Sequence, residues 1–215
     1  MQKLLLSALV LCATGSTAFA TVSFSSKSYG LNAPDHTNII IDFENKMPTG
    51  FSLTGGRVRN VTDDVGAEPA GDASYYLAAN PDDPAMLLST SGFRTISLYW
   101  GSMDDYNSIT LLDKNGKSIK SFTGLQISSP ANGDRADKST NRRVTFTTSG
   151  MTSPIYGLDF QSSTPAFEVD NIAFMTPGGE VPEPTTWTMM MGGLGLLGVS
   201  LRRSKKTGAL AVLRA

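Results

Sequence analysis

Residues that carry nucleophilic and metal-binding chemistry are almost missing from this chain. Its 215 residues include one cysteine, Cys12, and one histidine, His36. Cys12 lies in an apolar run near the start, so the rest of the chain can form no disulfide, thiol nucleophile or thiolate metal site. With one histidine in a polar segment and no serine in a G-x-S-x-G turn, nucleophilic catalysis and zinc binding also lack support. The folded part must therefore be stabilised by burial alone, and His36 is interpreted as a solvated loop residue.

Positive charge is scarce through most of the chain. All 19 acidic residues lie between Asp35 and Glu183. Only 12 basic residues lie in this part of the chain, all of them between Lys27 and Arg143. The whole chain has a net charge of only −1 because a basic cluster follows this stretch. A surface with an excess of acids repels the phosphate backbone, which argues against nucleic acid as a partner.

Residues 1–20 have the pattern of a secretory signal peptide. The cationic start Met1–Lys3 leads into the apolar run Leu4–Ala13, which is too short to span a membrane. Small residues then occupy both positions of a cleavage site, at Ala18 and Ala20. We expect cleavage after Ala20 and export of the remaining chain.

A second apolar segment, residues 185–201, contains no charged residue and would span about 25 Å as a helix. Trp187 near its start favours the headgroup region of a bilayer, and Arg202 and Arg203 after its end favour the cytoplasmic side. The sequence therefore predicts one transmembrane helix over 185–201. Residues 177–181 form a linker before it, and residues 207–215 form a cytoplasmic tail to which we assign no role.

The segment before this helix carries the string Pro182-Glu183-Pro184, which the two prolines hold extended. The order of the string, Trp187, the apolar span and the basic pair resembles the PEP-CTERM sorting signal in its PEPxxW variant, over residues 182–206. In that family, exosortase, a membrane-embedded transpeptidase, recognises the tail and passes the protein to the cell surface. The resemblance implies that Pro182, Glu183, Pro184 and Trp187 are recognised by exosortase, and that Arg202 and Arg203 hold the topology. An ordinary single-span anchor is the alternative.

The region between the two ends, residues 21–176, shows short alternating segments and no 3.6-residue apolar period. The tight turn Asp113–Gly116 predicts a hairpin, because Asn-Gly tolerates a positive φ. Eight or more turn-punctuated strands predict an all-β domain, an antiparallel β-sandwich of the jelly-roll type. Strands are expected at 22–26, 39–44, 57–61, 75–77, 86–88, 95–100, 108–112, 117–122, 143–147, 155–160 and 167–174.

Two strings in this domain resemble galactose-binding-like jelly-roll carbohydrate-binding modules: Asp42-Phe43-Glu44 and Val169-Asp170-Asn171-Ile172. In those modules a structural calcium ion lies between the first and last strands. The resemblance implies Glu44 and Asp170 as calcium ligands, with Asp42 as a further candidate. Alternatively, Asp42 and Asp170 are polar strand-end residues facing solvent. The acids of the next long loop (Asp63, Asp64, Glu68 and Asp72) are interpreted as a solvated surface.

Sugar binding needs exposed aromatic rings, for which Tyr75, Tyr106 and Trp100 are candidates. Trp100 ends an apolar strand, which favours the core instead. Two functions compete: a structural protein associated with exopolysaccharide or biofilm, and a carbohydrate-binding module with a specific glycan ligand. Glycoside hydrolysis would need two carboxyl groups about 5–9.5 Å apart across a cleft, and acidic residues alone do not indicate such a pair. We therefore predict a non-enzymatic protein.

Overall fold

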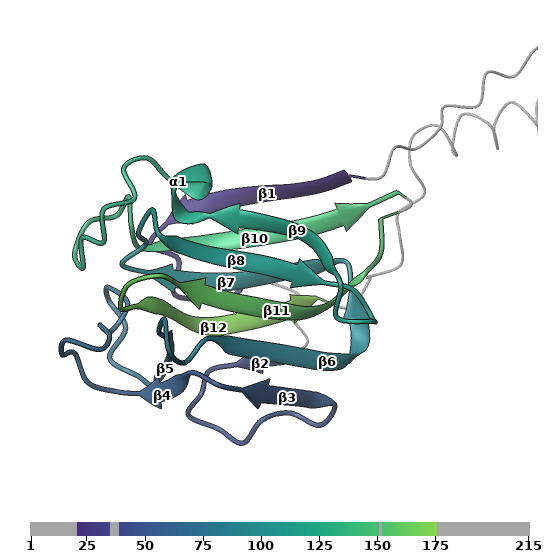
Figure 1. Ribbon diagram of the computed structural model, residues 1–215, viewed down its shortest axis with the longest axis horizontal. Helices are drawn as coiled ribbons and strands as arrows, with labels where there is room; N and C mark the ends of the chain where they lie inside the picture. The colour runs from purple at the N-terminus through teal and green to yellow at the C-terminus, as the bar shows by residue number, and fades with distance from the viewer. Residues whose placement is uncertain (1–20, 35–38, 151, 176–215) are drawn as a thin grey trace, which may run out of the picture. The chain divides into compact units, whose positions relative to one another are not determined.

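The alternating segments pair into two antiparallel sheets, which the computed structural model describes over residues 21–34, 39–150 and 152–175 (Figure 1). Sheet A contains, in spatial order, β1 (Thr21–Ser28), β10 (Arg142–Ser149), β7 (Thr95–Gly101), β12 (Phe167–Met175), β5 (Tyr76–Ala79) and β4 (Arg57–Arg59), and β2 (Ile39–Ile41) also pairs with β12. Sheet B contains β3 (Phe51–Thr54), β6 (Ala85–Phe93), β11 (Ile155–Ser162), β8 (Asn107–Leu112) and β9 (Ser118–Thr123). A short helix, α1 (Gly124–Ile127), follows β9.

The strand pairing confirms the predicted jelly roll. β5 pairs with β12, β6 with β11, β7 with β10 and β8 with β9, all antiparallel. These nested pairs are those of one long hairpin, and successive pairs alternate between sheet A and sheet B. Lateral pairing of β12 with β7 and of β11 with β8 completes each sheet. Rolling a long hairpin into two facing sheets in this way produces the jelly-roll topology.

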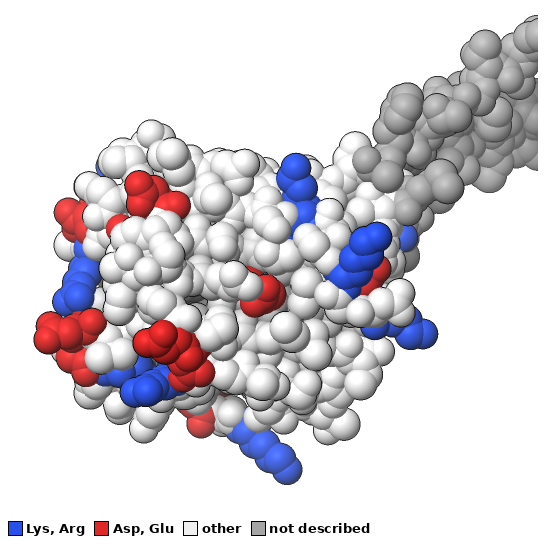
Figure 2. Space-filling model, viewed as in Figure 1, with Lys and Arg blue, Asp and Glu red and all other residues white. Residues whose placement is uncertain are grey.

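Strand register places both ends of the described domain at the same end of the sandwich. Met175 lies opposite Thr95, Thr95 opposite Thr147, and Thr147 opposite Ser23, so one row crosses sheet A between the last strand and the first. The β8–β9 turn, residues 113–117, lies at this end too, which we call the tether end (Figure 1). The opposite end, which carries segments 102–106, 128–141 and 163–166, is called the loop end. In Figure 2 the acidic residues gather mainly towards the loop end.

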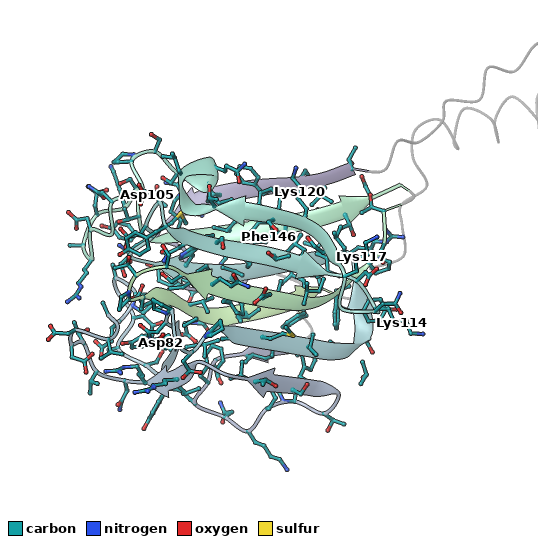
Figure 3. The ribbon with its side chains drawn as sticks, in the orientation of Figure 1. Asp82, Asp105, Lys114, Lys117, Lys120 and Phe146 are labelled. Atoms are coloured by element: carbon teal, nitrogen blue, oxygen red, sulfur yellow. The ribbon has the colours of Figure 1, made fainter. Side chains whose placement is uncertain are left out.

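Large apolar side chains fill the space between the sheets. Trp100 on β7 is fully buried and stacks on Phe167 with ring centroids 4.3 Å apart. Phe146, labelled in Figure 3, lies on sheet A and contacts Phe122 of sheet B at a centroid distance of 5.0 Å. Phe24 on the edge strand β1 packs edge-on against Phe122 at 5.5 Å and so closes the open side of the sandwich.

The last strand contains an irregularity that matters for the buried polar groups described below. Between Asp170 and Ala173 the register of β12 against β7 shifts, and Asn171 has a φ of 48°. Asparagine tolerates this left-handed conformation better than most residues, and an extra residue in one strand re-aims the neighbouring side chains. The shift also divides the other edge of β12, which pairs with β5 through residues 167–169 and with β2 through residues 172–174.

Two elements were not predicted. β3 is a four-residue strand between glycines, and only Phe51 and Leu53 of it turn towards the core. α1 is too short to show a helical period, although Thr123 and Gln126 form a capping box at its start. Across the described ranges no helix is long and apolar enough to cross a membrane, and the segment 185–201 predicted to do so lies outside those ranges.

Candidate functional site

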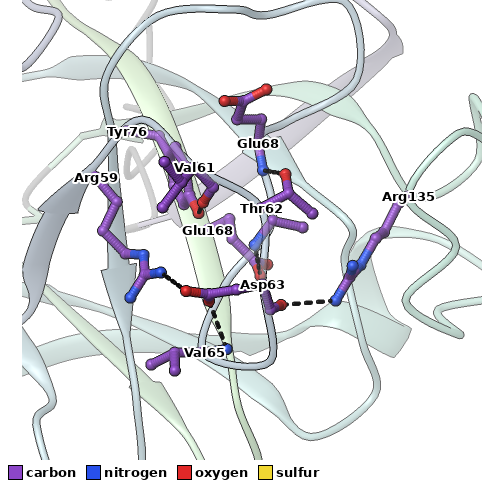
Figure 4. Close-up of polar contacts among 10 residues, drawn as sticks. Arg59, Val61, Thr62, Asp63, Val65, Glu68, Tyr76, Arg135 and Glu168 are labelled. Atoms are coloured by element: carbon purple, nitrogen blue, oxygen red, sulfur yellow. Dashed lines mark hydrogen bonds and ion pairs between the residues drawn. The ribbon is translucent and has the colours of Figure 1, made fainter.

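A buried polar network lies on the outer face of sheet A, under the loop that connects β4 to β5. This loop, residues 60–75, leaves the sheet and folds back over side chains that alternate with the core residues of β12. Figure 4 shows its first part. The side chain of Asp63 accepts a hydrogen bond from the Val65 amide at 2.8 Å and forms an ion pair with Arg59, and Arg135 donates to the Asp63 carbonyl at 3.3 Å. The Val65 amide and then the Arg59 guanidinium lower the pKa of Asp63.

Asn141 holds this loop to two others. Its side chain is fully buried, and its Oδ1 accepts hydrogen bonds from the backbone amides of Ala70 at 2.9 Å and Ser102 at 3.1 Å. Its Nδ2 donates to the carbonyls of Asp134 at 3.1 Å and Asp137 at 2.9 Å. One amide side chain thus uses both its acceptor sites and both its donors to join loop 60–75, segment 102–106 and segment 128–141.

Glu168 of β12 points into the space beneath loop 60–75 and is 4% exposed. Its two carboxyl oxygens accept hydrogen bonds from the Ala67 amide and from Ser102 Oγ, each at 3.0 Å. Burial raises the pKa of Glu168 to about 8, although both hydrogen bonds oppose the rise. The carboxyl group therefore pins the middle of the loop to the sheet.

Asp170, at the irregularity in β12, faces Asp72 of the loop. Ser74 Oγ donates to Asp72 Oδ1 and lies 3.2 Å from Asp170 Oδ2, and Asn171 Nδ2 donates to Asp170 Oδ2 at 3.1 Å. The other two oxygens, Asp72 Oδ2 and Asp170 Oδ1, are buried and have no donor among the described residues. Burial, followed by the hydrogen bond to the Asp72 carboxyl, raises the pKa of Asp170 to about 9. Asp170 is therefore protonated at neutral pH, and its proton gives the carboxyl group a donor that can face Asp72.

Arg143 of β10 supplies a positive charge close to this pair. It is 5% exposed, and its guanidinium donates to the carbonyls of Gly30 at 2.6 Å, Asn171 at 2.7 Å and Leu31. Burial lowers the pKa of Arg143 to about 10, while the charge of Asp170 opposes that fall. The side chain therefore remains charged at neutral pH and fixes the chain after β1 to the irregular part of β12.

This network is suited to holding loops rather than to acid–base catalysis on a substrate. Glu168 and Asp170 are two acidic residues two positions apart on one strand face, with backbone positions about 6.6 Å apart. However, they are 4% and 0% exposed, so a sugar cannot contact either carboxyl group without removal of the loop above them.

The structure separates the three aromatic ligand candidates. Trp100 lies in the core and offers no free ring face. Tyr106 is half-buried, its hydroxyl lies 3.5 Å from the Pro165 carbonyl, and burial raises its pKa. Tyr75 is 42% exposed, beside the fully buried Tyr76. Of the three rings, that of Tyr75 is the most accessible to a sugar.

The calcium candidates occupy different environments. Asp42 caps its own turn, with Oδ1 3.2 Å from the amides of both Glu44 and Asn45 and Oδ2 2.8 Å from Asn45 Nδ2. Glu44 is exposed, whereas Asp170 is buried against Asp72. In the part of the chain that the structure describes, no three acidic, histidine or cysteine side chains lie close enough to hold a metal ion. Calcium binding by Glu44 and Asp170 stays a prediction.

The sequence did not indicate the surroundings of three residues of the network, Asp72, Asp170 and Asn141. Asp72, interpreted as part of a solvated loop, is 8% exposed, and Asp170, for which solvent exposure was one alternative, is fully buried. Asp72-x-Ser74 has the pattern of a local turn, in which Asp72 Oδ1 accepts from the Ser74 amide at 3.0 Å. No local pattern links position 72 to position 170, or marks Asn141 as the residue that joins the loops.

Comparison with known proteins gives one match of direct functional meaning. Residues 180–204 match the family model described as the PEP-CTERM protein-sorting motif. The residues predicted for sorting and for signal cleavage lie outside the described ranges. No curated protein matches the chain.

Two solved structures show a distant likeness. The first holds the CBM22-1 and GH10 modules of Clostridium thermocellum endo-1,4-β-D-xylanase 10B complexed with xylohexaose, at 13% identity and a TM-score of 0.33, covering 67% of this chain and 29% of that one. The second is the enzymatically active domain of bacteriophage CBA120 tailspike protein 4, at 13% identity and a TM-score of 0.28, covering 66% and 21%. The chain thus spans less than a third of either, and at these TM-scores neither likeness bears on its function.

The functional assignment therefore rests on the motif and not on the sandwich. The motif match begins two residues before the Pro-Glu-Pro string and includes the basic pair at Arg202 and Arg203. The chain carries a PEP-CTERM protein-sorting motif at residues 180–204, which implies exosortase-dependent export and sorting towards the cell surface.

Proposed function

We propose that this chain is an exported bacterial surface protein whose tail is cut by exosortase, and whose β-sandwich acts without catalysis in the exopolysaccharide or biofilm around the cell. The match to the sorting motif at residues 180–204 carries this proposal. Exosortase recognises the Pro182–Pro184 string and Trp187, while the span 185–201 holds the protein in the inner membrane until it is processed. The released domain then remains at the cell surface or in the extracellular matrix.

The surface of sheet B supports an association with polysaccharide. Along one row of its outer face, Thr54 lies opposite Met86, Met86 opposite Asp159, Asp159 opposite Thr110 and Thr110 opposite Ser121. The hydroxyl groups of Thr110 and Ser121 lie 2.8 Å apart. Figure 2 shows this broad face with few charges. The hydroxyl groups of Thr54, Thr110 and Ser121 in this row can exchange hydrogen bonds with hydrated sugar chains.

The alternative is a carbohydrate-binding module with a specific glycan, which the exposure of Tyr75 favours. Native gel electrophoresis through immobilised polysaccharides separates the two functions. A specific module loses its retardation when Tyr75 is replaced by alanine, whereas Tyr106→Phe, which keeps the ring, leaves it unchanged. Weak retardation by many polysaccharides that Tyr75→Ala does not alter supports the general matrix role.

The sorting function is tested by changing the recognised string and locating the protein. Glu183→Ala in the native host is expected to leave the chain in the inner-membrane fraction, as deletion of the exosortase does. Glu180→Ala, which lies outside the Pro-Glu-Pro string, serves as the matched control and is expected to leave release unchanged. Normal release of the Glu183→Ala chain in the native host, or of the unaltered chain in an exosortase-deficient strain, would refute the proposal.

A further inference from the structure

The tether end of the sandwich differs in charge from the loop end. Lys114 and Lys117 are exposed in the β8–β9 turn, and Lys120 is exposed on β9 (Figure 3). The nearby Asp113 is occupied by the turn itself, because its Oδ1 accepts from the amides of Asn115 at 2.8 Å and Lys117 at 2.9 Å. These three lysines, which we call the lysine hairpin, leave their ammonium groups directed into solvent.

The loop end is acidic by contrast. Asp82 and Asp105, both exposed, are labelled at the opposite side of the molecule from Lys114 and Lys117 in Figure 3. Exposed acids in the neighbouring loops add to them, namely Asp64, Asp134 and Asp137, and these five acids outnumber the exposed Arg135 and Lys138 of segment 128–141. Opposite signs at opposite ends give the domain a charge asymmetry along the strands, so an anionic surface attracts one end and repels the other.

The last described strand ends at the tether end, where the lysine hairpin lies. Met175 ends β12 in the same transverse row as Ser23 of β1. From residue 176 to residue 184 the chain can extend by at most about 30 Å. If the segment from residue 185 onward is in the bilayer, as the proposed function holds, the tether end must lie within that reach of the lipid headgroups. Such tethering gives a millimolar-range effective concentration, so weak attraction is enough to dock the domain.

We propose that, before exosortase cuts the tail, the lysine hairpin docks on anionic phospholipid headgroups of the membrane that holds the tail. Each exposed lysine near such a surface adds to the attraction, while the acidic loop end is turned away from it. Docking rests on the proposed membrane anchor. It would present the sandwich in one orientation, with the chain leaving β12 next to the membrane surface where the sorting string must be cut.

The test uses the chain with its tail intact, reconstituted into vesicles of phosphatidylcholine alone or of equal parts phosphatidylcholine and phosphatidylglycerol. A membrane-impermeant acylating reagent reports the accessibility of each lysine by mass spectrometry. In the anionic vesicles, acylation of Lys114 and Lys117 is expected to be roughly fivefold slower than in the neutral vesicles. Acylation of Lys138, on the loop-end segment 128–141, is expected to be unchanged, and high salt is expected to abolish the difference.

Matched variants identify the source of the protection. Lys117→Gln is expected to reduce the protection of Lys114 and Lys120, whereas Lys138→Gln, with the same change in charge, is expected to have no effect. Equal reactivity in the two kinds of vesicle would overturn the docking proposal. So would protection that appears only when an anionic polysaccharide is added, because the hairpin would then belong to the matrix.

Carbonate washing of the vesicles distinguishes the two proposals. A chain that leaves the vesicles would refute the membrane anchor, and docking with it. A chain that stays while its hairpin lysines react equally fast in both lipids would refute docking alone.

Discussion

The raised pKa of the buried Asp170 predicts an unusual dependence of stability on pH. The folded-state pKa of Asp170 is about 9, well above the value of 3.8 for a solvated aspartate. Between these values the folded chain holds a proton that the unfolded chain has lost. The stability that protonated Asp170 contributes is therefore complete below about pH 3.8 and is lost as the pH rises towards 9. Glu168, with a pKa of about 8, acts in the same direction.

The size of the effect follows from proton linkage. One proton held only by the folded state changes the free energy of unfolding by about 1.4 kcal/mol per pH unit. From about pH 5 to pH 8 the wild-type chain should therefore lose on the order of 4 kcal/mol through Asp170, and somewhat more with Glu168. Asp170→Asn removes this requirement, since the amide Nδ2 can donate to Asp72 in place of the Asp170 carboxyl proton.

Urea denaturation followed by circular dichroism at a series of pH values measures the difference. Asp170→Asn is expected to be more stable than the wild type at pH 8 and to show a shallower fall from pH 5. Asp82→Asn, at an exposed site, is the matched control and should keep the wild-type slope. An Asp170→Asn variant with the wild-type slope, or a wild-type stability that increases from pH 5 to pH 8, would refute the protonation of Asp170 in the folded chain.

Three further predictions concern packing and loops. Asn141→Ala leaves the amides of Ala70 and Ser102 without an acceptor and should cost on the order of 3 kcal/mol, with faster proteolysis in loop 60–75; an unchanged cleavage pattern would contradict its joining role. Phe146→Ala should cost about 3–5 kcal/mol in urea denaturation, because its ring is fully buried, and a loss below about 1 kcal/mol would argue against the described core. Gly116→Ala should cost about 1 kcal/mol through its φ of +73° alone, since no atom lies within 4 Å of the added methyl group; a stabilised variant would contradict the turn geometry.

Local patterns predicted the strands and the turn between β8 and β9 because these depend on residues close in sequence. The 95–100 segment became β7, and Asp113–Gly116 closes as expected, with the Gly116 amide 3.0 Å from the Asp113 carbonyl. β3 was missed because Phe51–Thr54 is short and lies between glycines, so its alternation is hidden by turn residues.

The polar network could not be predicted from local sequence patterns, because its contacts join residues that are distant in the sequence. The proximity of Asp72 to Asp170 arises from loop 60–75 lying over β12, and the conformation of Asn171 arises from a register shift that only the paired strands define. The resemblance to carbohydrate-binding modules drew attention to Asp170 but paired it with Glu44. The described structure places Asp72 beside Asp170, and calcium binding with Glu44 stays a prediction. The sorting residues could be predicted from the sequence alone. The Pro-Glu-Pro string, the apolar span and the basic pair follow one another along the chain, so the pattern can be recognised without knowledge of the fold.

Intact mass of the surface-exposed protein tests most directly whether the tail is a processed sorting signal. The protein should be isolated from the native host and from a strain without exosortase. We predict that the surface form starts at Thr21 and ends near Pro182–Pro184 in the native host, and that the tail is kept in the other strain. A surface form that retains residues 185–215 in both strains would make the tail a plain membrane anchor and contradict the account.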